Sequence, residues 1–403
     1  MKTFKIMLLL AATMLSAAAA RAGLLEYSNY GYPLGQSDAF GLAIGGTGLA
    51  LGGDPVLANP ALLAQGGGRI QAQVTGSTAW LQEKRTREVF DSYDNSVGLN
   101  TDLLHSHYHY DLRSLSLGYG FKPGGLSLGF GLGYGREYSF DYDCRLEKRD
   151  AFYYLTEIQT ISGHGNISRL TGAVSLAPLS FISFGLGLSR MSGEQRLSTE
   201  YNYTDPSRTN YRLATTCQYQ GNRLEAGLWG RITERIRLGF SAHTKAKLTE
   251  TLKTERNGAS GDTSRSVTYP AEYAMGLAYL PANDFPASVF LEYRYTPWQR
   301  LADNLNPGHR LNAVNRYSLG IEHLVANSLP LRFGISYANS YLNRGIGLAQ
   351  ASLGTKIPAG PVALGVAASF GRRSYNLGQA YGHSDVTTVT ESLAEILLTV
   401  STK

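Results

Sequence analysis

The segment from Gly125 to Cys144, GLSLGFGLGYGREYSFDYDC, alternates between two kinds of residue along its whole length. Its even-numbered positions are apolar or aromatic apart from Arg136, and its odd-numbered positions are Gly, Ser, Glu or Asp. Because a strand sends successive side chains to opposite faces, the pattern predicts one continuous apolar face. Strands of soluble sandwiches usually stop after about five or six residues. The much longer run is typical of a tilted membrane strand that projects past the lipid surface.

The same alternation recurs along the chain, with Phe290 as an exception inside one strand. We count about fourteen such strands, near residues 69–84, 108–122, 125–145, 165–178, 180–202, 212–232, 234–254, 265–281, 286–299, 312–325, 329–341, 345–357, 360–375 and 388–401. Single-chain bacterial barrels have an even number of antiparallel strands, with lipid-facing and lumen-facing residues in alternation. The predicted fold class is therefore all-β, an antiparallel transmembrane β-barrel of about fourteen strands.

The lengths of the connections predict how the barrel is oriented. Short links such as KPGG, APL and PAG follow the even-numbered strands, and most long polar links follow the odd-numbered ones. Outer-membrane barrels have short periplasmic turns and long outer loops. We therefore expect both termini of the barrel to lie on the periplasmic side.

The first residues predict export to the cell envelope. Lys2 and Lys5 precede an apolar stretch, and Ala20-Arg21-Ala22 fits a signal-peptidase site, so residues 1–22 are predicted to be a signal peptide. After it, no run of some 18 apolar residues could span a bilayer as a helix. The net charge of +6 falls to +3 without these three cations, which is too weak to indicate nucleic-acid binding. We expect the outer membrane of a Gram-negative bacterium.

The stretch from Gly45 to Ala64, GGTGLALGGDPVLANPALLA, begins like a nucleotide-binding loop but does not complete one. Leu51 stands where the third glycine of G-x-G-x-x-G is required, and no acidic residue follows about 20 positions later. Its small residues suit close backbone packing inside a barrel too wide for side chains to fill. We therefore predict that residues 23–68 are an N-terminal hatch that plugs the lumen, and that residues 69–403 are the barrel.

The segment from Ser37 to Ala64, between a signal peptide and about fourteen strands, resembles the FadL/TodX superfamily of outer-membrane long-chain fatty acid transporters. This superfamily includes the PorV-like barrels of secretion systems. In that family a hatch segment rich in Ala and Gly carries an Asn-Pro-Ala triplet, which Asn59, Pro60 and Ala61 match, and an acid shortly before it, which Asp54 matches.

The resemblance implies transport of hydrophobic compounds such as long-chain fatty acids, with hatch movement and lateral release where a strand kinks. An apolar pocket with a side exit lets a greasy solute avoid the polar membrane surface. The expected partners are outer-membrane lipid and a hydrophobic ligand. The alternative is a PorV-like role, with a protein partner, in secretion or assembly. Asn59 and Pro60 either take part in hatch movement or only end a short helix and hold the hatch.

Other residues are weaker candidates. The apolar loop residues could form a ligand entry or belong to an aromatic girdle: Phe152, Tyr153, Tyr154, Leu155 and Ile158. His105, His107 and His109 have a spacing that could meet a metal, but they are also explained as exposed histidines. Cys144 and Cys217 could pair or stay separate. No Ser-His-acid set can be assembled from the sequence, so we expect no enzyme, catalytic residue, metal or cofactor.

A set of charged residues is predicted to face the lumen, either to bind an anion or to satisfy one another and the hatch backbone. They are Arg237, Lys245, Lys247, Glu272, Glu292, Arg294, Arg316, Glu322, Glu391 and Glu395.

Overall fold

We analysed a computed structural model of the chain. It describes residues 26, 30–91, 93, 95–149, 154–256, 259–282, 286–308, 310–325, 329–378 and 386–402, without the side chains of residues 105–108. The predicted signal peptide lies outside these residues. No described helix is long and apolar enough to cross a membrane.

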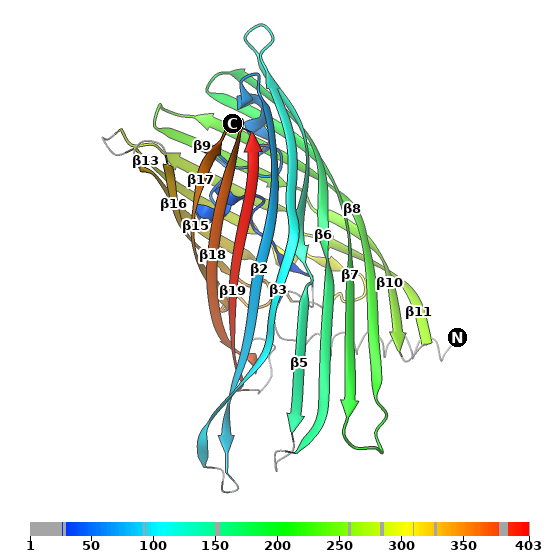
Figure 1. Cartoon of the computed structure of the whole chain (residues 1–403). Coiled ribbons are helices and arrows are strands. Elements are labelled where there is room, and N and C mark those ends of the chain that lie inside the picture. The colour runs from blue at the N-terminus through cyan, green and yellow to red at the C-terminus, as the bar shows by residue number, and fades with distance from the viewer. Residues whose placement is uncertain are drawn as a thin grey trace.

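The described strands form one closed antiparallel sheet (Figure 1). Its wall has fourteen strands, three of which are each divided into two labelled pieces. In chain order the wall consists of β2 (Ile70–Phe90), β3 (Ser96–Phe121), β4 (Ser127–Ser139) with β5 (Tyr142–Arg149), β6 (Leu155–Leu179), β7 (Ile182–Tyr203), β8 (Tyr211–Arg231), β9 (Ile236–His243) with β10 (Ala246–Arg256), β11 (Ala259–Tyr269) with β12 (Glu272–Tyr279), β13 (Ala287–Thr296), β15 (Val314–Val325), β16 (Leu329–Asn339), β17 (Gly347–Ala359), β18 (Val362–Asn376) and β19 (Thr388–Thr402). Pairing of β19 with β2 closes the barrel. The predicted fold class and strand number are confirmed.

The barrel wall is much taller on one side than a membrane requires. β6 has 25 residues and β7 has 22, whereas about 9–11 residues suffice to cross the hydrocarbon core. β6, β7 and β8 extend toward the end that carries the long hairpins, at the bottom of Figure 1, and the C-terminus lies at the opposite end. By loop length, the hairpin end is the extracellular side and the C-terminal end is periplasmic.

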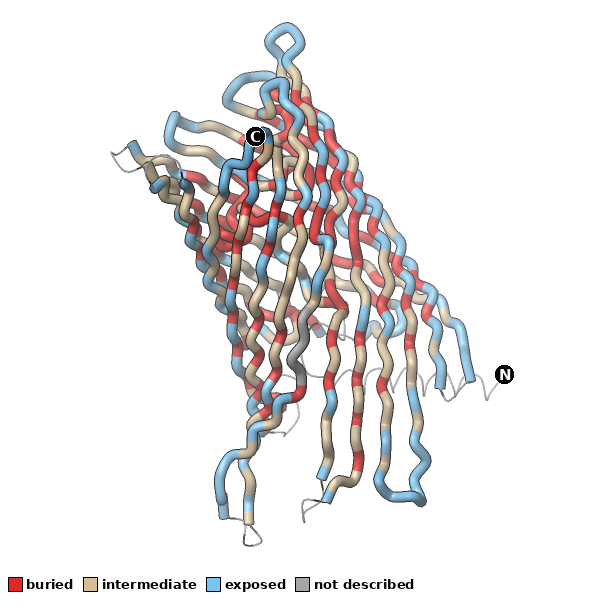
Figure 2. Tube along the Cα trace, viewed as in Figure 1, coloured by how far each residue is buried: buried red, intermediate tan, exposed pale blue. Residues whose placement is uncertain are grey.

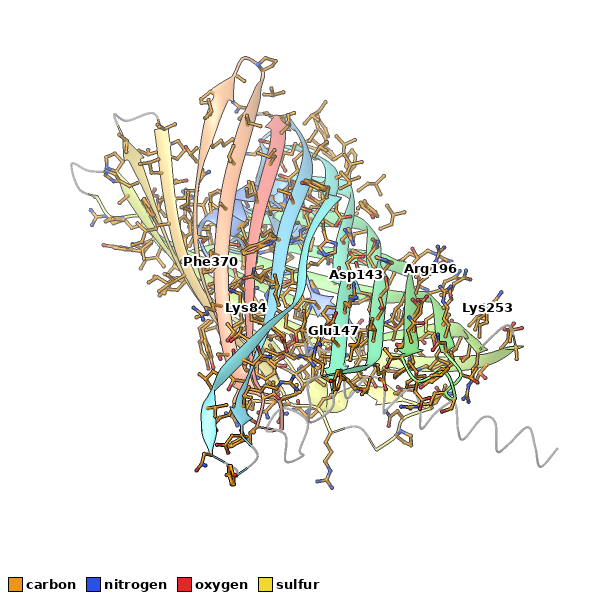
Figure 3. All side chains as sticks on the ribbon, turned by 60° about the horizontal axis from the view of Figure 1, so that its bottom comes forward. Lys84, Asp143, Glu147, Arg196, Lys253 and Phe370 are labelled. Carbon is orange, nitrogen blue, oxygen red and sulfur yellow. The ribbon has the colours of Figure 1, made fainter. Side chains whose placement is uncertain are left out.

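Apolar side chains form a belt around the outside of the wall. Leu132 on β4, Leu186 on β7 and Met275 on β12 are more than 60% exposed, and Phe370 on β18, labelled in Figure 3, is 51% exposed. Exposed and buried residues alternate along the strands in Figure 2. The small and polar residues between the exposed ones face the lumen, as in membrane barrels.

One β-bulge reverses the alternation in the strand that begins at Gly125. The pairing of β4 with β6 shifts by one residue between Arg136 and Tyr138. A one-residue shift sends every later side chain to the opposite face. Phe140 and Tyr142 are therefore 1% exposed, inside the barrel. The prediction of one continuous outer apolar face was wrong beyond Arg136.

A second bulge reverses the alternation between β9 and β10. His243 pairs with Glu225 of β8, but Lys247 pairs with Asn222, so one residue is extra on this strand. Lys245 and Lys247 are exposed, while Ala246 and Leu248 between and beyond them are buried. The prediction that Lys245 and Lys247 face the lumen was wrong for this reason.

The residues before β2 fold inside the barrel. They form β1 (Tyr32–Pro33), α2 (Ala39–Ala43) and the 3-10 helix η1 (Pro60–Gly66). α2 contacts β17 and β18, while η1 contacts β3, β4, β6, β7 and β8. Asp54, Asn59 and Ala61 have no exposed surface. In Figure 1 this part of the chain, in dark blue, lies within the ring of strands. We call residues 30–68 the hatch segment.

Candidate functional site

Asp54 and Asn59 organise the turns of the hatch segment. Asp54 Oδ1 accepts hydrogen bonds from the backbone N–H groups of Val56 (2.8 Å) and Leu57 (3.0 Å). Its Oδ2 accepts one from the side chain of Gln73 on β2. Asn59 Oδ1 accepts from the Ala61 N–H (3.1 Å), which caps η1. Both residues are therefore structural parts of the hatch in this state.

Asn59 also ties the hatch to the wall. Its Nδ2 donates to the carbonyl of Leu49 within the hatch (3.0 Å) and to that of Leu228 on β8 (3.2 Å). Pro60 occupies the first position of η1, where its missing N–H costs nothing. The Ala61 carbonyl accepts from Ser183 Oγ of β7 (2.9 Å). The triplet thus joins the hatch to two neighbouring strands.

The N–H groups of the glycine-rich turn bind a carboxylate of the wall. Glu292 Oε2 on β13 accepts from the N–H of Gly48 (3.1 Å) and of Leu49 (3.3 Å). Successive N–H groups of a turn form a site for an anion. Here that position is filled from within the chain, consistent with the prediction that this stretch is not a phosphate loop.

Asp38 links the start of α2 to the turn at Asp54. Its Oδ1 accepts from the Gly41 N–H (2.6 Å) as the cap of α2, and its Oδ2 accepts from the Asp54 N–H (2.9 Å). Burial raises the pKa of Asp38 to about 6, against the lowering effect of the Gly41 hydrogen bond.

Inward-facing glycines let the hatch touch the wall backbone. A Cβ atom at any of six strand glycines would collide with hatch atoms: Gly129, Gly185, Gly227, Gly239, Gly320 and Gly334. They lie on β4, β7, β8, β9, β15 and β16. The glycines of the alternating pattern therefore serve the fit between the hatch and the wall as well as the polarity of the lumen.

A cavity of about 180 Å³ lies between the hatch segment and the wall. One side is formed by hatch residues, including Tyr32, Leu34 and Leu57, and another by β4 between Gly135 and Tyr138. The side chains of Trp298, in the 3-10 helix η2 (Trp298–Arg300), and of Tyr341 add apolar surface.

The charged residues around the cavity mostly pair with one another. The pairs, with their N···O separations, are Arg169 with Glu225 (2.8 Å), Arg223 with Glu137 (3.0 Å), Arg294 with Glu272 (2.6 Å) and Arg373 with Glu26 (2.6 Å). Arg332 and Glu322 pair similarly, at 2.7 Å. Arg316 makes no ion pair with a described residue and donates to Ser336 Oγ at 3.4 Å. The observed pairs and the Glu292 contacts fit the alternative in which lumenal charges satisfy one another and the hatch.

The backbone hydrogen-bond ladder of the wall is interrupted beside this cavity, among the described residues. β3 pairs with β4 from Phe121 to Ser114, and the last paired residue on β4 is Gly135. Beyond it, β5 pairs with β6, and no described ladder joins β5 to β3. The edge of β4 that β3 leaves is taken by β1: Tyr32 lies opposite Ser139, and the Leu34 N–H donates to the Glu137 carbonyl (2.7 Å). The hatch segment thus covers a lateral gap between β3 and β4–β5.

Side chains bridge the gap where the ladder is missing. The guanidinium of Arg136 on β4 makes an ion pair with Asp111 on β3 and lies 3.3 Å from Asp141, between β4 and β5. The Arg136 side chain is only 5% exposed. We call the Arg136–Asp111 pair the gap latch.

The outer half of the lumen contains two clusters of buried apolar and aromatic side chains. An aromatic cluster includes Trp298 stacked on Tyr341, with ring centres 4.2 Å apart, and Phe140 stacked on Tyr219 at 5.6 Å. Tyr142 belongs to a second apolar cluster with Leu81 and Leu104, next to the gap. Phe140 and Tyr142 escape the sequence pattern because the bulge in β4 turns them inside.

The remaining candidate residues are separate from this cavity. Tyr154 is 72% exposed at the outer end of β6, Leu155 and Ile158 are half-buried, and Phe152 and Tyr153 lie outside the described residues. Cys144 and Cys217 are buried free thiols. The side chains of His105 and His107 are not described, and no group of three or more potential metal ligands occurs among the described side chains.

No protein-family model matches this sequence, and a search of curated proteins gives no match. Solved structures do match along most of the chain. A Pseudomonas aeruginosa FadL homologue is 15% identical with a TM-score of 0.64, covering 92% of this chain and 99% of that one. The Pseudomonas putida toluene transporter TodX is 16% identical, with a TM-score of 0.60 and the same coverage. The Ralstonia pickettii toluene transporter TbuX is 14% identical, with a TM-score of 0.62 and again the same coverage. At these identities the likeness establishes a shared fold, and the FadL/TodX resemblance is confirmed at that level.

Proposed function

We propose that this protein moves hydrophobic small molecules across the outer membrane of a Gram-negative bacterium and releases them sideways through the gap between β3 and β4–β5. The observation that carries the proposal is the missing ladder beside the cavity. A closed barrel stabilises its wall by pairing every strand along its length, so an unpaired stretch next to an internal cavity requires a reason. The shared fold with two toluene transporters and a FadL homologue supports it.

The two apolar clusters of the outer lumen and the gap together suit a hydrophobic solute. Contact with Phe140, Tyr142 and Trp298 stabilises such a molecule by about 25 cal/mol for each Å² of apolar surface removed from water. From the cavity it would pass between β3 and β4 into the apolar belt of the membrane, without entering the aqueous periplasm. No energy source is needed beyond removal of the product on the far side.

The size of the cavity bears on the substrate. Its volume of about 180 Å³ is close to the roughly 150 Å³ cavity that accepts benzene and is below the roughly 300–1,000 Å³ of pockets for drug-sized ligands. A single aromatic ring or a short chain fits the state described. A long-chain fatty acid would fit only if the side chains of the aromatic cluster on the extracellular side of the cavity moved apart.

β1 acts as the gate in this proposal, because it occupies the edge of β4 that faces the gap. The test is a disulfide between Tyr32→Cys and Ser139→Cys, made with Cys144 and Cys217 replaced by Ala. Paired residues of antiparallel strands have Cα atoms about 4.5–5.5 Å apart, within disulfide range. We expect uptake of labelled toluene and oleate into liposomes to fall at least tenfold when oxidised and to recover on reduction.

The control is a disulfide in the fixed wall, between Gln220→Cys and Thr249→Cys, which pair across β8 and β10. This bond is expected to leave uptake unchanged. If oxidation of the Tyr32/Ser139 pair also leaves uptake unchanged, release between β3 and β4 is wrong.

The PorV-like role in secretion or assembly stays a prediction. It requires a protein partner that co-purifies from membranes in mild detergent. A detergent-solubilised protein that is free of partners and active in uptake would contradict it.

A further inference from the structure

We propose that a patch on the outer surface of β7, β8 and β10 binds the phosphate groups of a phosphorylated glycolipid in the outer leaflet. The patch consists of Arg190, Lys245 and Lys247, with Asn222 between Arg190 and Lys247 and with Gln220 next to Asn222 on the extracellular side. All five residues are exposed on the outside of the barrel. The inference rests on the outer-membrane placement proposed above, and it is independent of transport.

The strand register brings these cations together. Arg190 on β7 lies opposite Asn222 on β8, and Asn222 lies opposite Lys247 on β10. Neighbouring strands are about 4.8 Å apart, so the Cα atoms of Arg190 and Lys247 are separated by about 10 Å. Both side chains are long enough to reach a common phosphate group between them. Lys245, two residues before Lys247 and beside the level of Leu224, is turned to the same outer face by the bulge after His243.

The height of the patch matches that of lipid head groups. Leu188 on β7 and Leu224 on β8, each 58% exposed, lie opposite each other and directly on the periplasmic side of the Arg190–Asn222 pair. On the extracellular side the outer face becomes polar, with Ser192, Gln220 and Thr249 in one row. The patch therefore lies at the upper edge of the apolar belt, where the phosphates of an outer-leaflet lipid would lie.

No acidic residue in the described part of the chain pairs with the cations of the patch. Arg190 makes one long hydrogen bond, to Gln220 Oε1 at 3.4 Å, and no ion pair with a described residue involves Arg190, Lys245 or Lys247. The next acid along β7, Glu194, already binds Arg196. The inward acids of the same strands, Glu225 and Glu250, are buried and bind arginines inside the barrel. Arginine and lysine are the residues that bind phosphate best, arginine through two donors at once.

The occupant is a membrane lipid rather than a free phosphate ion, because the patch continues into an apolar surface. A lipid that places its phosphate between Arg190 and Lys247 would lay its acyl chains on Leu188 and Leu224. Inorganic phosphate could bind only to the charged residues and would make no contact with the apolar surface.

The test measures binding of bis-phosphorylated lipid A to the full-length protein in a neutral detergent by native mass spectrometry. The patch variant is Arg190→Gln/Lys245→Gln/Lys247→Gln. A basic residue near an anionic lipid surface contributes about 1 kcal/mol, or roughly fivefold in affinity, so we expect the variant to bind at least tenfold more weakly. Lipid A without its phosphates should bind the native protein as weakly as bis-phosphorylated lipid A binds the patch variant. Millimolar inorganic phosphate should not displace lipid A.

The control removes three exposed cations elsewhere, through Lys84→Gln, Arg87→Gln and Lys122→Gln. Lys84, labelled in Figure 3, lies on β2, away from Arg196 on β7 and Lys253 on β10, two of the strands that carry the patch. We expect this control to bind within twofold of the native protein. Lys245→Arg/Lys247→Arg should also retain binding, which separates charge from folding. Equal binding by the patch variant and the native protein, or equal loss in the control, would overturn the proposal, and neither result bears on uptake.

Discussion

At the scale of single residues, Asn59 joins three parts of the protein: the start of η1, the Leu49 turn and β8. Asn59→Ala removes all three hydrogen bonds from a buried site, at a cost of about 1–3 kcal/mol for the unsatisfied partners. We expect backbone amides of residues 45–66 to exchange with solvent about ten- to a hundredfold faster, as measured by hydrogen-exchange mass spectrometry. Asn59→Ser keeps the cap of η1 but cannot reach Leu228, so its amide exchange rates should lie between those of the native protein and of Asn59→Ala. Unchanged exchange in Asn59→Ala would mean that the hatch is held by its glycine contacts alone.

Gly334 on β16 tests those contacts. A Cβ atom at this position would overlap the backbone of Ile44 and Gly45, which cannot turn aside as the end of a flexible side chain can. Gly334→Ala should therefore unseat this turn of the hatch, seen as faster proteolysis of the hatch in the folded barrel. The matched control is Gly172→Ala on β6, where the nearest atom, Leu132 Cδ2, is 3.7 Å away and the new methyl group fits. Equal proteolysis of the two variants would contradict a tight fit at Gly334.

At the scale of structural elements, the gap latch replaces the missing ladder between β3 and β4. Asp111→Asn keeps the shape of the side chain but removes its charge, while the contact of Arg136 with Asp141 stays. Losing one partner of a largely buried ion pair costs more than losing an exposed pair. We expect faster amide exchange at residues 135–139 and faster toluene uptake. Glu147→Gln, which breaks exposed pairs with Arg145 and Arg149, should change neither. Slower uptake in Asp111→Asn would contradict a latch that restrains opening.

The sequence predicts the strands of the wall but not the bulges within them. The two-residue period predicts every strand of the wall, because each strand has a face toward lipid and a face toward the lumen. It cannot predict the bulges after Arg136 and His243, because no residue type marks an extra position, yet each bulge reverses all later side chains. Tyr142 thereby enters the lumen and Lys247 leaves it. Phe290, an exception to the sequence pattern, packs inside against Phe40 of the hatch at a ring distance of 6.0 Å.

The hatch shows the same limit for long-range partners. The resemblance to a known family singles out Asp54, Asn59, Pro60 and Ala61, and all four are buried at the centre of the hatch. Two wall residues that hold the triplet, Ser183 at Ala61 and Leu228 at Asn59, lie more than 100 positions away in the chain. Only the closure of the barrel brings these partners together, so no local pattern could identify them.

At the scale of the whole molecule, the lumen is closed at two levels, by the hatch and by the aromatic cluster beyond the cavity. A fourteen-stranded wall is too wide for its own side chains to fill, so the hatch must supply most of the closure. Tyr30, which belongs to the hatch segment, is also a member of the aromatic cluster, and its hydroxyl donates to Asp303 (3.0 Å) in the short strand β14 (Ala302–Asp303). Removal of the hatch segment would therefore weaken both levels at once.

This coupling makes a prediction for ion conductance. In planar bilayers the native protein should show no steady conductance, and a variant lacking residues 30–66 should form a water-filled pore, because the polar inner face of the wall becomes hydrated once the hatch is gone. Heat-dependent mobility in electrophoresis should show that the variant barrel is folded. The Tyr32/Ser139 disulfide should not open a pore in either redox state, since it fixes β1 without displacing the turns at Gly48 and Asn59. Steady conductance of the native protein would instead identify an open channel for polar solutes, and the hatch contacts described here would then not seal the lumen.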